Sequence, residues 1–163
     1  MHKRPLHPAA IAHIRGGADN PTLIGTVRFY QFYKGVLVVT DLCGLPENSS
    51  GFFALHIHEG GSCSTGSIES PFPDTGMHYN PDGEEHPRHS GDLPPLLSAR
   101  GCAYSAVLTD RFTVREVLGR TVVVHGNGDD LHTQPSGGAG IKIACGVIRA
   151  DRAGTPSPAR HPR

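Results

Sequence analysis

The stretch FFALHIH, residues 52–58, decides the fold class, because apolar residues alternate in it with Ala54 and two histidines. Successive side chains of a strand point to opposite faces, so this period predicts a β-strand with one face in a core. His56 and His58 lie together on the other face. At this spacing the two Cα atoms are roughly 6.5–7 Å apart, and both imidazoles can reach a single ion. The strand that helps to build the core thus also presents a candidate metal site.

Segments of strand composition continue on both sides of this stretch. Recurring β-branched and aromatic residues predict strands at residues 8–14, 22–33, 36–42, 102–109, 120–126 and 141–150. Two stretches without periodicity, 59–101 and 126–140, predict long loops, and residues 112–119 are typical of a turn. The 21 Gly and 14 Pro residues favour turns over helices. We therefore predict an all-β fold, an antiparallel barrel or sandwich with two long functional loops.

Length and composition limit the classes of protein. The 163 residues suit one domain, which we place at 1–150, followed by a polar, Pro-punctuated tail at 151–163 that we expect to be disordered. Lys+Arg and Asp+Glu both number 15 and no basic run occurs, so we expect no nucleic-acid partner. No run of about 18 apolar residues occurs, so we expect no membrane partner.

The first 17 residues, MHKRPLHPAAIAHIRGG, bear on the compartment. They contain basic residues, but Pro8 and His13 interrupt their apolar part, and no secretory apolar region follows. This start predicts a cytoplasmic protein. If a leader has been trimmed from the sequence, an extracytoplasmic protein is expected instead.

A second set of metal donors lies in the first predicted loop. His78, His86, His89 and Asp92 follow the spacing H-x7-H-x2-H-x2-D. Three imidazoles and a carboxylate suit tetrahedral zinc, and four protein donors leave no open position, which is typical of a structural site. The alternative is a solvated loop that happens to be rich in histidine.

A further histidine, His125, ends the predicted strand at 120–126 and can project toward the region of His56 and His58. Three or four imidazole nitrogens around one ion favour copper over magnesium or calcium. Spacing alone leaves open which histidines share an ion. The residues by themselves therefore predict a histidine-ligated protein with one or two metals.

The sequence resembles the copper/zinc superoxide dismutase family, in its bacterial form, from about Ile14 to Ile148. The similarity rests on ordered motifs, which are GTVRFYQ, GVLVVTDLCGLP, FALHIHEGGSC, GMHYNP, HSGDLPPL, RTVVVHG, GDDL and GGAGIKIACGVI. The resemblance implies a Greek-key barrel of about eight strands, whose loops are the zinc loop and the electrostatic loop. It also implies that His56, His58, His78 and His125 bind copper, and that His78, His86, His89 and Asp92 bind zinc. His78 would be shared between the two ions.

The resemblance also implies a reaction. Cu(II) would oxidise one superoxide to dioxygen, and Cu(I) would reduce a second to hydrogen peroxide, with His78 taking up a proton, while zinc would do no redox chemistry. Asp129 would accept hydrogen bonds from one ring of each ligand set. Lys142 stands where the family usually has an arginine beside copper, so we expect it to attract superoxide with weaker orientation.

The four cysteines are assigned by the same resemblance. Cys63 and Cys145 match the family's disulfide, which would pin the first loop to the last strand. Cys43 and Cys102 are left over, and we expect them to be buried thiols.

Two other functions use the same residues. A metal-storage or metal-delivery protein would keep the fold but lack a copper ligand or the shared histidine, and this sequence lacks neither. A zinc hydrolase needs an open zinc position, which the His3Asp set does not leave. The family includes monomers and homodimers, so we expect one of these two states.

Overall fold

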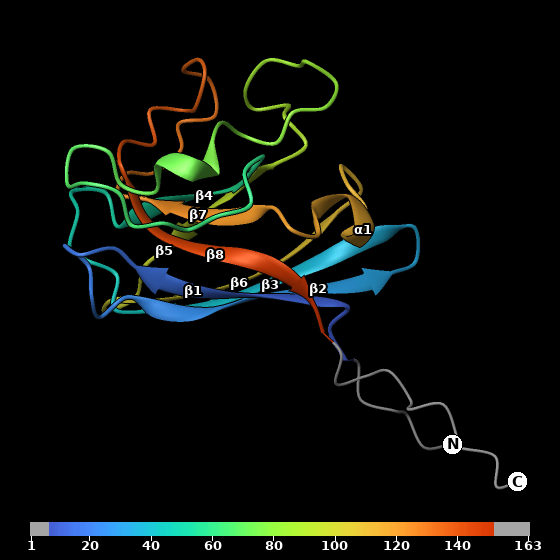
Figure 1. Ribbon diagram of the computed structural model, residues 1–163, viewed down its shortest axis with the longest axis horizontal. Coiled ribbons are helices and arrows are strands. Elements are labelled where there is room, and N and C mark those ends of the chain that lie inside the picture. Colours follow the sequence, from blue (N-terminus) through green and yellow to red (C-terminus); the bar gives the residue numbers. More distant parts are fainter. Residues whose placement is uncertain (1–6, 152–163) are drawn as a thin grey trace, which may run out of the picture.

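The computed structural model describes residues 7–151, and its framework is one antiparallel sheet of eight strands (Figure 1). The strands are β1 (Ala10–Gly16), β2 (Ile24–Phe32), β3 (Gly35–Cys43), β4 (Phe52–His58), β5 (Asp92–Leu97), β6 (Cys102–Thr109), β7 (Thr121–His125) and β8 (Lys142–Ala150). Their order is β5-β4-β7-β8-β1-β2-β3-β6, and contacts between the end strands β5 and β6 bring the sheet close to a closed barrel. The predicted all-β Greek-key barrel is confirmed. The expected tail lies outside the described residues, apart from Asp151.

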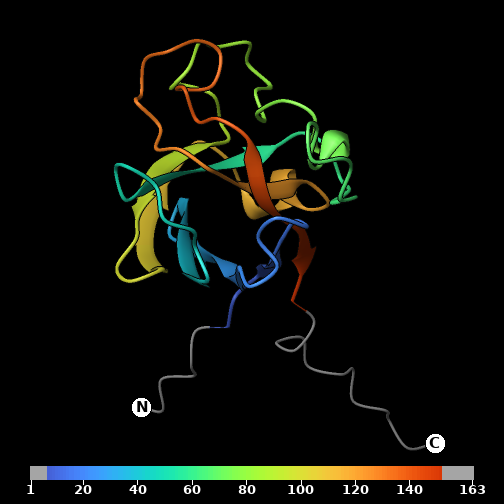
Figure 2. The ribbon, with the colours of Figure 1, turned by 90° about the vertical axis from the view of Figure 1, so that its left-hand side faces the viewer.

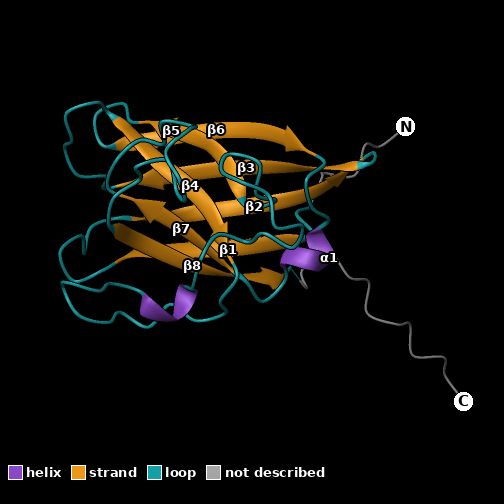
Figure 3. Ribbon diagram, turned by 90° about the horizontal axis from the view of Figure 1, so that it is seen from above, coloured by secondary structure: helices purple, strands orange, loops and turns teal. Residues whose placement is uncertain are grey.

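Helices contribute little to the described part of the chain (Figure 3). The 3₁₀ helix η1 (Pro73–Thr75) lies in the first loop, and α1 (Val114–Val117) lies in the segment predicted to be a turn. A capping box nucleates α1, because the Glu116 N–H donates to Thr113 Oγ1 and the Thr113 N–H donates to Glu116 Oε2. None of the described helices is long and apolar enough to cross a membrane.

Strand β5 was not predicted, because its sequence DLPPLL falls in the stretch taken as a continuous loop. Pro94 and Pro95 lack the N–H groups that a central strand needs, and they conceal the strand pattern. β5 is hydrogen-bonded only to β4 and forms one end of the sheet, where proline is tolerated. The first loop is therefore shorter than predicted and spans residues 59–91, and the second loop spans residues 126–141.

The barrel interior buries the apolar face of β4 as the alternation predicts. Phe53, Leu55 and Ile57 join the main core, where each buried side chain of this size contributes about 1.5–3 kcal/mol relative to exposure. The opposite face of β4 carries His56 and His58, which are buried as well. The two long loops lie over this outer face of β4 and β7 (Figures 1 and 2). The histidines are thus enclosed between the barrel wall and the loops.

Both pairs of cysteines form disulfides. Cys63 is joined to Cys145, which links the first loop to β8. The prediction that Cys43 and Cys102 are buried thiols is wrong, because their side chains are exposed and joined to each other. They are 59 residues apart in sequence, and only the register of β3 with β6 places them opposite one another.

Candidate metal centre

Two segments of the first loop join the same edge of β4 at its end. In the first segment, the Glu59 N–H donates to Met77 O at 2.9 Å and the Tyr79 N–H donates to Ile57 O at 2.8 Å. These bonds form an isolated antiparallel bridge that sets His58 opposite His78. Backbone pairing, rather than side-chain attraction, therefore brings His78 to the strand.

The second segment, which leads into β5, carries the carboxylate. The Ile57 N–H donates to Gly91 O at 2.8 Å, and Asp92 is the register partner of His56. β7 pairs with the opposite edge of β4 and ends at His125. The barrel register thus collects donors that lie far apart in the sequence.

Two groups of donors result, and every member is buried. The four-histidine group contains His56, His58, His78 and His125, and the His–Asp group contains His78, His86, His89 and Asp92. In each group, one donor atom from every residue lies within 4.8 Å of the others. The structure brings together all seven residues that the sequence singled out as metal donors, and His78 belongs to both groups.

The spacing within the His–Asp group suits a small cation. His78 Nδ1 lies 3.3 Å from His89 Nδ1, and Asp92 Oδ2 lies 3.0 Å from His86 Nδ1 and 3.2 Å from His89 Nδ1. Four donors placed tetrahedrally at zinc bond lengths of about 2.0 Å are about 3.3 Å apart. The donors therefore already have the spacing of a tetrahedral site.

Backbone carbonyls fix the tautomers of two rings in the four-histidine group. His58 Nδ1–H donates to Gly76 O at 2.9 Å, and His125 Nδ1–H donates to Gly140 O at 3.2 Å. The Nε2 atoms of these two rings lie 3.2 Å apart. Both rings thus turn an Nε2 lone pair toward the same point, which is the orientation that a metal ligand needs.

Asp129 fixes one ring of each group. His56 Nε2–H donates to Asp129 Oδ2 at 2.7 Å, and His86 Nε2–H donates to Asp129 Oδ1 at 2.9 Å. Burial raises the pKa of Asp129, but the bonds from His56, the Leu131 N–H and His86 outweigh it and lower the pKa to about 2. Gly137 makes room for this contact, because a Cβ there would lie 1.9 Å from Asp129 Oδ1.

Within the two donor groups, three buried ring nitrogens make no hydrogen bond, namely His56 Nδ1, His78 Nε2 and His86 Nδ1. Buried polar atoms are rarely left unpaired, and an ion is a common explanation. His56 and His86 each use their other ring nitrogen on Asp129, so the unpaired one is free to bind a metal. His78 Nδ1 lies beside Asp92 and His89, and its buried Nε2 makes no hydrogen bond, which suits an imidazole between two cations. The residues therefore fit one ion in each group.

Two of the histidines resist protonation. Burial, then the charge of His125, lowers the pKa of His58 to about 2, and burial, then the charge of His56, lowers the pKa of His125 to about 3. Neutral imidazole is the metal-binding form. Both rings are therefore available as ligands well below neutral pH.

This burial predicts acid sensitivity in protein that a chelator has freed of metal. Between pH 6.5 and 3 the unfolded chain binds protons at His58 and His125 that the folded chain does not bind. The free energy of unfolding therefore decreases as the pH is lowered. The loss is about 2 kcal/mol per histidine between pH 6.5 and 5. Urea unfolding at pH 7 and pH 5 measures it. His125→Gln should reduce the difference, and His13→Gln, at an exposed position of β1, should not. Equal stability at both pH values would contradict this reading.

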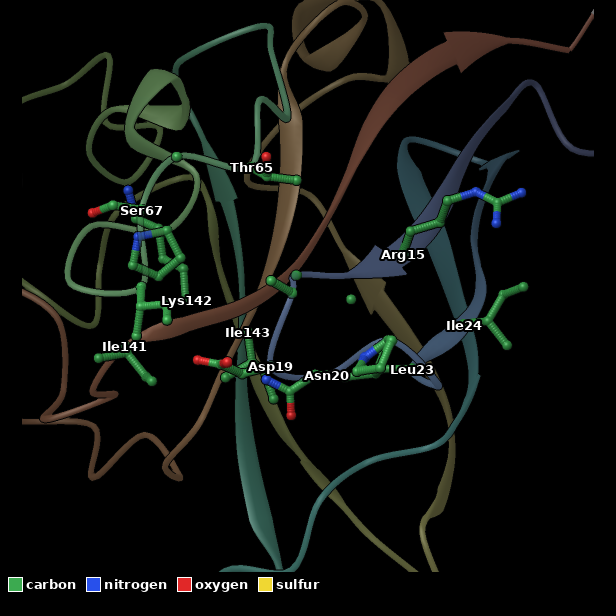
Figure 4. Close-up of a pocket in the computed structure, with 17 residues that line it drawn as sticks. Arg15, Asp19, Asn20, Leu23, Ile24, Thr65, Ser67, Ile141, Lys142 and Ile143 are labelled. Atoms are coloured by element: carbon green, nitrogen blue, oxygen red, sulfur yellow. The ribbon is translucent and has the colours of Figure 1, made fainter.

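Lys142, at the start of β8, points its ammonium toward the first loop. Nζ donates to Thr75 Oγ1 at 2.7 Å, Gly76 O at 3.3 Å and Phe72 O at 3.4 Å. Lys142 also lies in the wall of a cavity of about 530 Å³ between the β1–β2 turn, the first loop and β8 (Figure 4). That cavity is lined by none of the clustered histidines, so it is separate from the metal centre.

Sequence reasoning missed the groups that hold the ligands through the backbone. The carbonyls of Gly76 and Gly140 orient His58 and His125, and every residue type offers a carbonyl, so composition gives no signal for them. Gln134 was also missed, although its carboxamide bonds to the backbone of His86. Its place in the irregular second loop was the one available hint.

Comparisons with known proteins agree with this geometry. Residues 23–148 match the family described as copper/zinc superoxide dismutase. A Cu-Zn superoxide dismutase of Photobacterium leiognathi is 34% identical over 139 residues, which are 77% of this chain and 79% of the relative. One from Legionella pneumophila is 36% identical over 135 residues, covering 79% and 80% of the two chains. The solved structure of the Cu/Zn superoxide dismutase from Brucella abortus superposes with a TM-score of 0.72 at 26% identity, over 85% of this chain and 98% of that one. The chain belongs to the copper/zinc superoxide dismutase family.

Proposed function

We propose that this protein is a superoxide dismutase in which the four-histidine group binds copper and the His–Asp group binds zinc. The observation that carries the proposal is the pair of buried donor groups joined at His78, each with the donors that its metal prefers. When bound, copper supplies the one-electron chemistry, accepting an electron from one superoxide and giving it to a second.

The residues of the chain supply orientation and a proton. Gly76 O, Gly140 O and Asp129 hold the rings of His58, His125 and His56 in the tautomers that leave a lone pair for copper. Hydrogen peroxide needs two protons that superoxide lacks. His78 belongs to the four-histidine group, and its Nε2 is buried and makes no hydrogen bond, so this atom is placed to hold one of these protons and release it to the product.

The His–Asp group has a structural role in this proposal. Its four donors have the number and spacing that a tetrahedral zinc site needs, which would leave no position for a substrate and disfavours a zinc hydrolase. These residues would hold zinc, which would order the first loop and fix the orientation of His78. A storage or delivery protein is disfavoured as well, since neither a copper ligand nor the shared histidine is missing.

Lys142 is proposed to attract superoxide through its positive charge. Lys142→Met keeps the length of the side chain and removes the charge, so kcat/KM should fall about 10-fold at low ionic strength and depend less on salt. Lys34→Met, in the exposed β2–β3 turn, is the matched control. Copper content must be measured in parallel, because Gly76 O accepts from both Lys142 and His58. Unchanged kcat/KM at full copper content would rule out the attraction.

The two disulfides bear on the compartment. Disulfides persist in oxidising compartments and are rare in the cytosol. We therefore propose an extracytoplasmic location, against the expectation of a cytoplasmic one. That the protein contacts neither nucleic acid nor membrane, and that it is a monomer or homodimer, stay predictions of the sequence.

Superoxide decay measured by stopped flow tests the function. Protein reconstituted with copper and zinc, with the metal content quantified and free copper chelated, should consume superoxide catalytically. His58→Ala removes one copper donor and should lower the rate at least about 100-fold. Loss of a group that only supports a ligand typically lowers metal affinity or activity by about 10- to 100-fold. Full metal content without activity above chelated copper would overturn the proposal and leave a metal-binding protein.

A further inference from the structure

The carboxamide of Gln134, in the second loop, forms two hydrogen bonds with the backbone of His86, in the first loop. The His86 N–H donates to Gln134 Oε1 at 3.0 Å, and Gln134 Nε2 donates to His86 O at 2.6 Å. The two residues are 48 positions apart in sequence, so the pair of bonds joins the two loops directly.

The same loop also holds the ring of His86. Asp129 accepts from His86 Nε2–H at 2.9 Å, so the second loop fixes both the backbone and the ring of this residue. Only Nδ1 is left, and it lies 3.0 Å from Asp92 Oδ2 within the His–Asp group. The direction in which His86 presents Nδ1 is therefore set by Gln134 and Asp129 together.

The residues next to Gln134 are held in a fixed turn within the second loop. Asp130 Oδ1 accepts from the N–H groups of His132 and Thr133, at 3.0 and 2.8 Å, and the Gly137 N–H donates to Thr133 O at 2.7 Å. These bonds form a compact turn directly beside Gln134. A shift of this turn would move the carboxamide, and with it the backbone of His86.

We propose that Gln134 is a positioning residue for the zinc ligand His86, and that it couples zinc binding to the order of the second loop. The inference rests on the proposed binding of zinc by the His–Asp group. Coupling between two sites is reciprocal, so zinc stabilises the loop to the extent that the ordered loop strengthens zinc binding. Groups that support a metal ligand typically change affinity 10–100-fold, and Gln134 belongs at the low end because it is exposed.

Two variants separate the contributions of the carboxamide. Gln134→Ala removes both hydrogen bonds. Gln134→Glu keeps an acceptor for the His86 N–H, but its carboxylate cannot donate to His86 O and repels it. Gln31→Ala is the matched control, because Gln31 also donates its carboxamide to a backbone carbonyl, Gly35 O, but lies on β2. Zinc release to a chelator is measured from each reconstituted protein. Absorption of cobalt(II) substituted for zinc reports the geometry of the site.

Gln134→Ala should release zinc about 10-fold faster and alter the cobalt(II) bands, with Gln134→Glu in between and Gln31→Ala at the wild-type rate. Amide hydrogen exchange adds a readout of the coupling. Zinc should slow amide hydrogen exchange at residues 127–140 in the wild type, and it should slow this exchange less in Gln134→Ala. Zinc release and cobalt(II) bands unchanged in both Gln134 variants would overturn the inference while leaving the zinc site intact. A wild-type protein that binds no zinc would instead overturn the proposed function, and this inference with it.

Discussion

The variant Asp129→Asn should bind both copper and zinc about 10- to 100-fold more weakly than the wild type. One Asp129 oxygen accepts from His56 and the other from His86, so a single side chain orients a ligand in each group. Asparagine loses the negative charge and replaces one oxygen with an NH2 group, which cannot accept a hydrogen bond. At limiting metal, superoxide consumption should fall in proportion to the loss of bound copper. Chelator competition measures the two dissociation constants.

The neighbouring Asp130 provides the control. Its carboxylate caps the turn at His132 and Thr133 and bonds to no histidine of either group. Asp130→Asn keeps one oxygen that accepts from the N–H groups of His132 and Thr133, so the turn is retained and either metal affinity should change much less than in Asp129→Asn. Weakening of one metal alone in Asp129→Asn would show that Asp129 does not link the two groups as the bond distances indicate.

Removal of the Cys63–Cys145 disulfide should lower both stability and metal affinity. The bond closes a segment of 82 residues, so its loss in the paired serine variant should lower the free energy of unfolding by about 4 kcal/mol. Cys63 and Cys145 pack with Phe72, which begins the segment that presents Gly76 O to His58. Loosening this segment should release copper more readily. Urea unfolding and copper affinity measure the two effects.

The Cys43–Cys102 disulfide offers a matched comparison. It closes 59 residues, so its paired serine variant should lose a similar free energy of unfolding, about 4 kcal/mol. It joins β3 to β6, away from the loops that cover the histidines, so copper affinity should not change. Equal loss of copper affinity in both paired variants would mean that global stability, and not the anchored loop, controls the metal centre.

Much of this centre could be predicted from the sequence. The alternation in residues 52–58 placed His56 and His58 on one strand face, because side-chain direction in a strand depends on local spacing alone. The H-x7-H-x2-H-x2-D pattern gave the donors of one group, because that segment of the loop is short. Membership of His125 and the sharing of His78 could not follow from spacing, since both depend on the β4–β7 register and on the His58–His78 bridge.

Other features depend on contacts that leave no local pattern. Cys43 and Cys102 meet only through the register of β3 and β6, and β5 is concealed by prolines that only an edge strand tolerates. The Gln134 contact joins two irregular loops through backbone atoms of His86, so neither periodicity nor residue type indicates it.

The sharing of His78 between two ions is tested most directly by crystallography of the reconstituted protein. Anomalous scattering recorded on both sides of the copper and zinc absorption edges locates each element. The account predicts copper beside His78 Nε2 among His56, His58 and His125, and zinc beside His78 Nδ1 among His86, His89 and Asp92. A single ion, or two ions that do not flank the His78 ring, would contradict it.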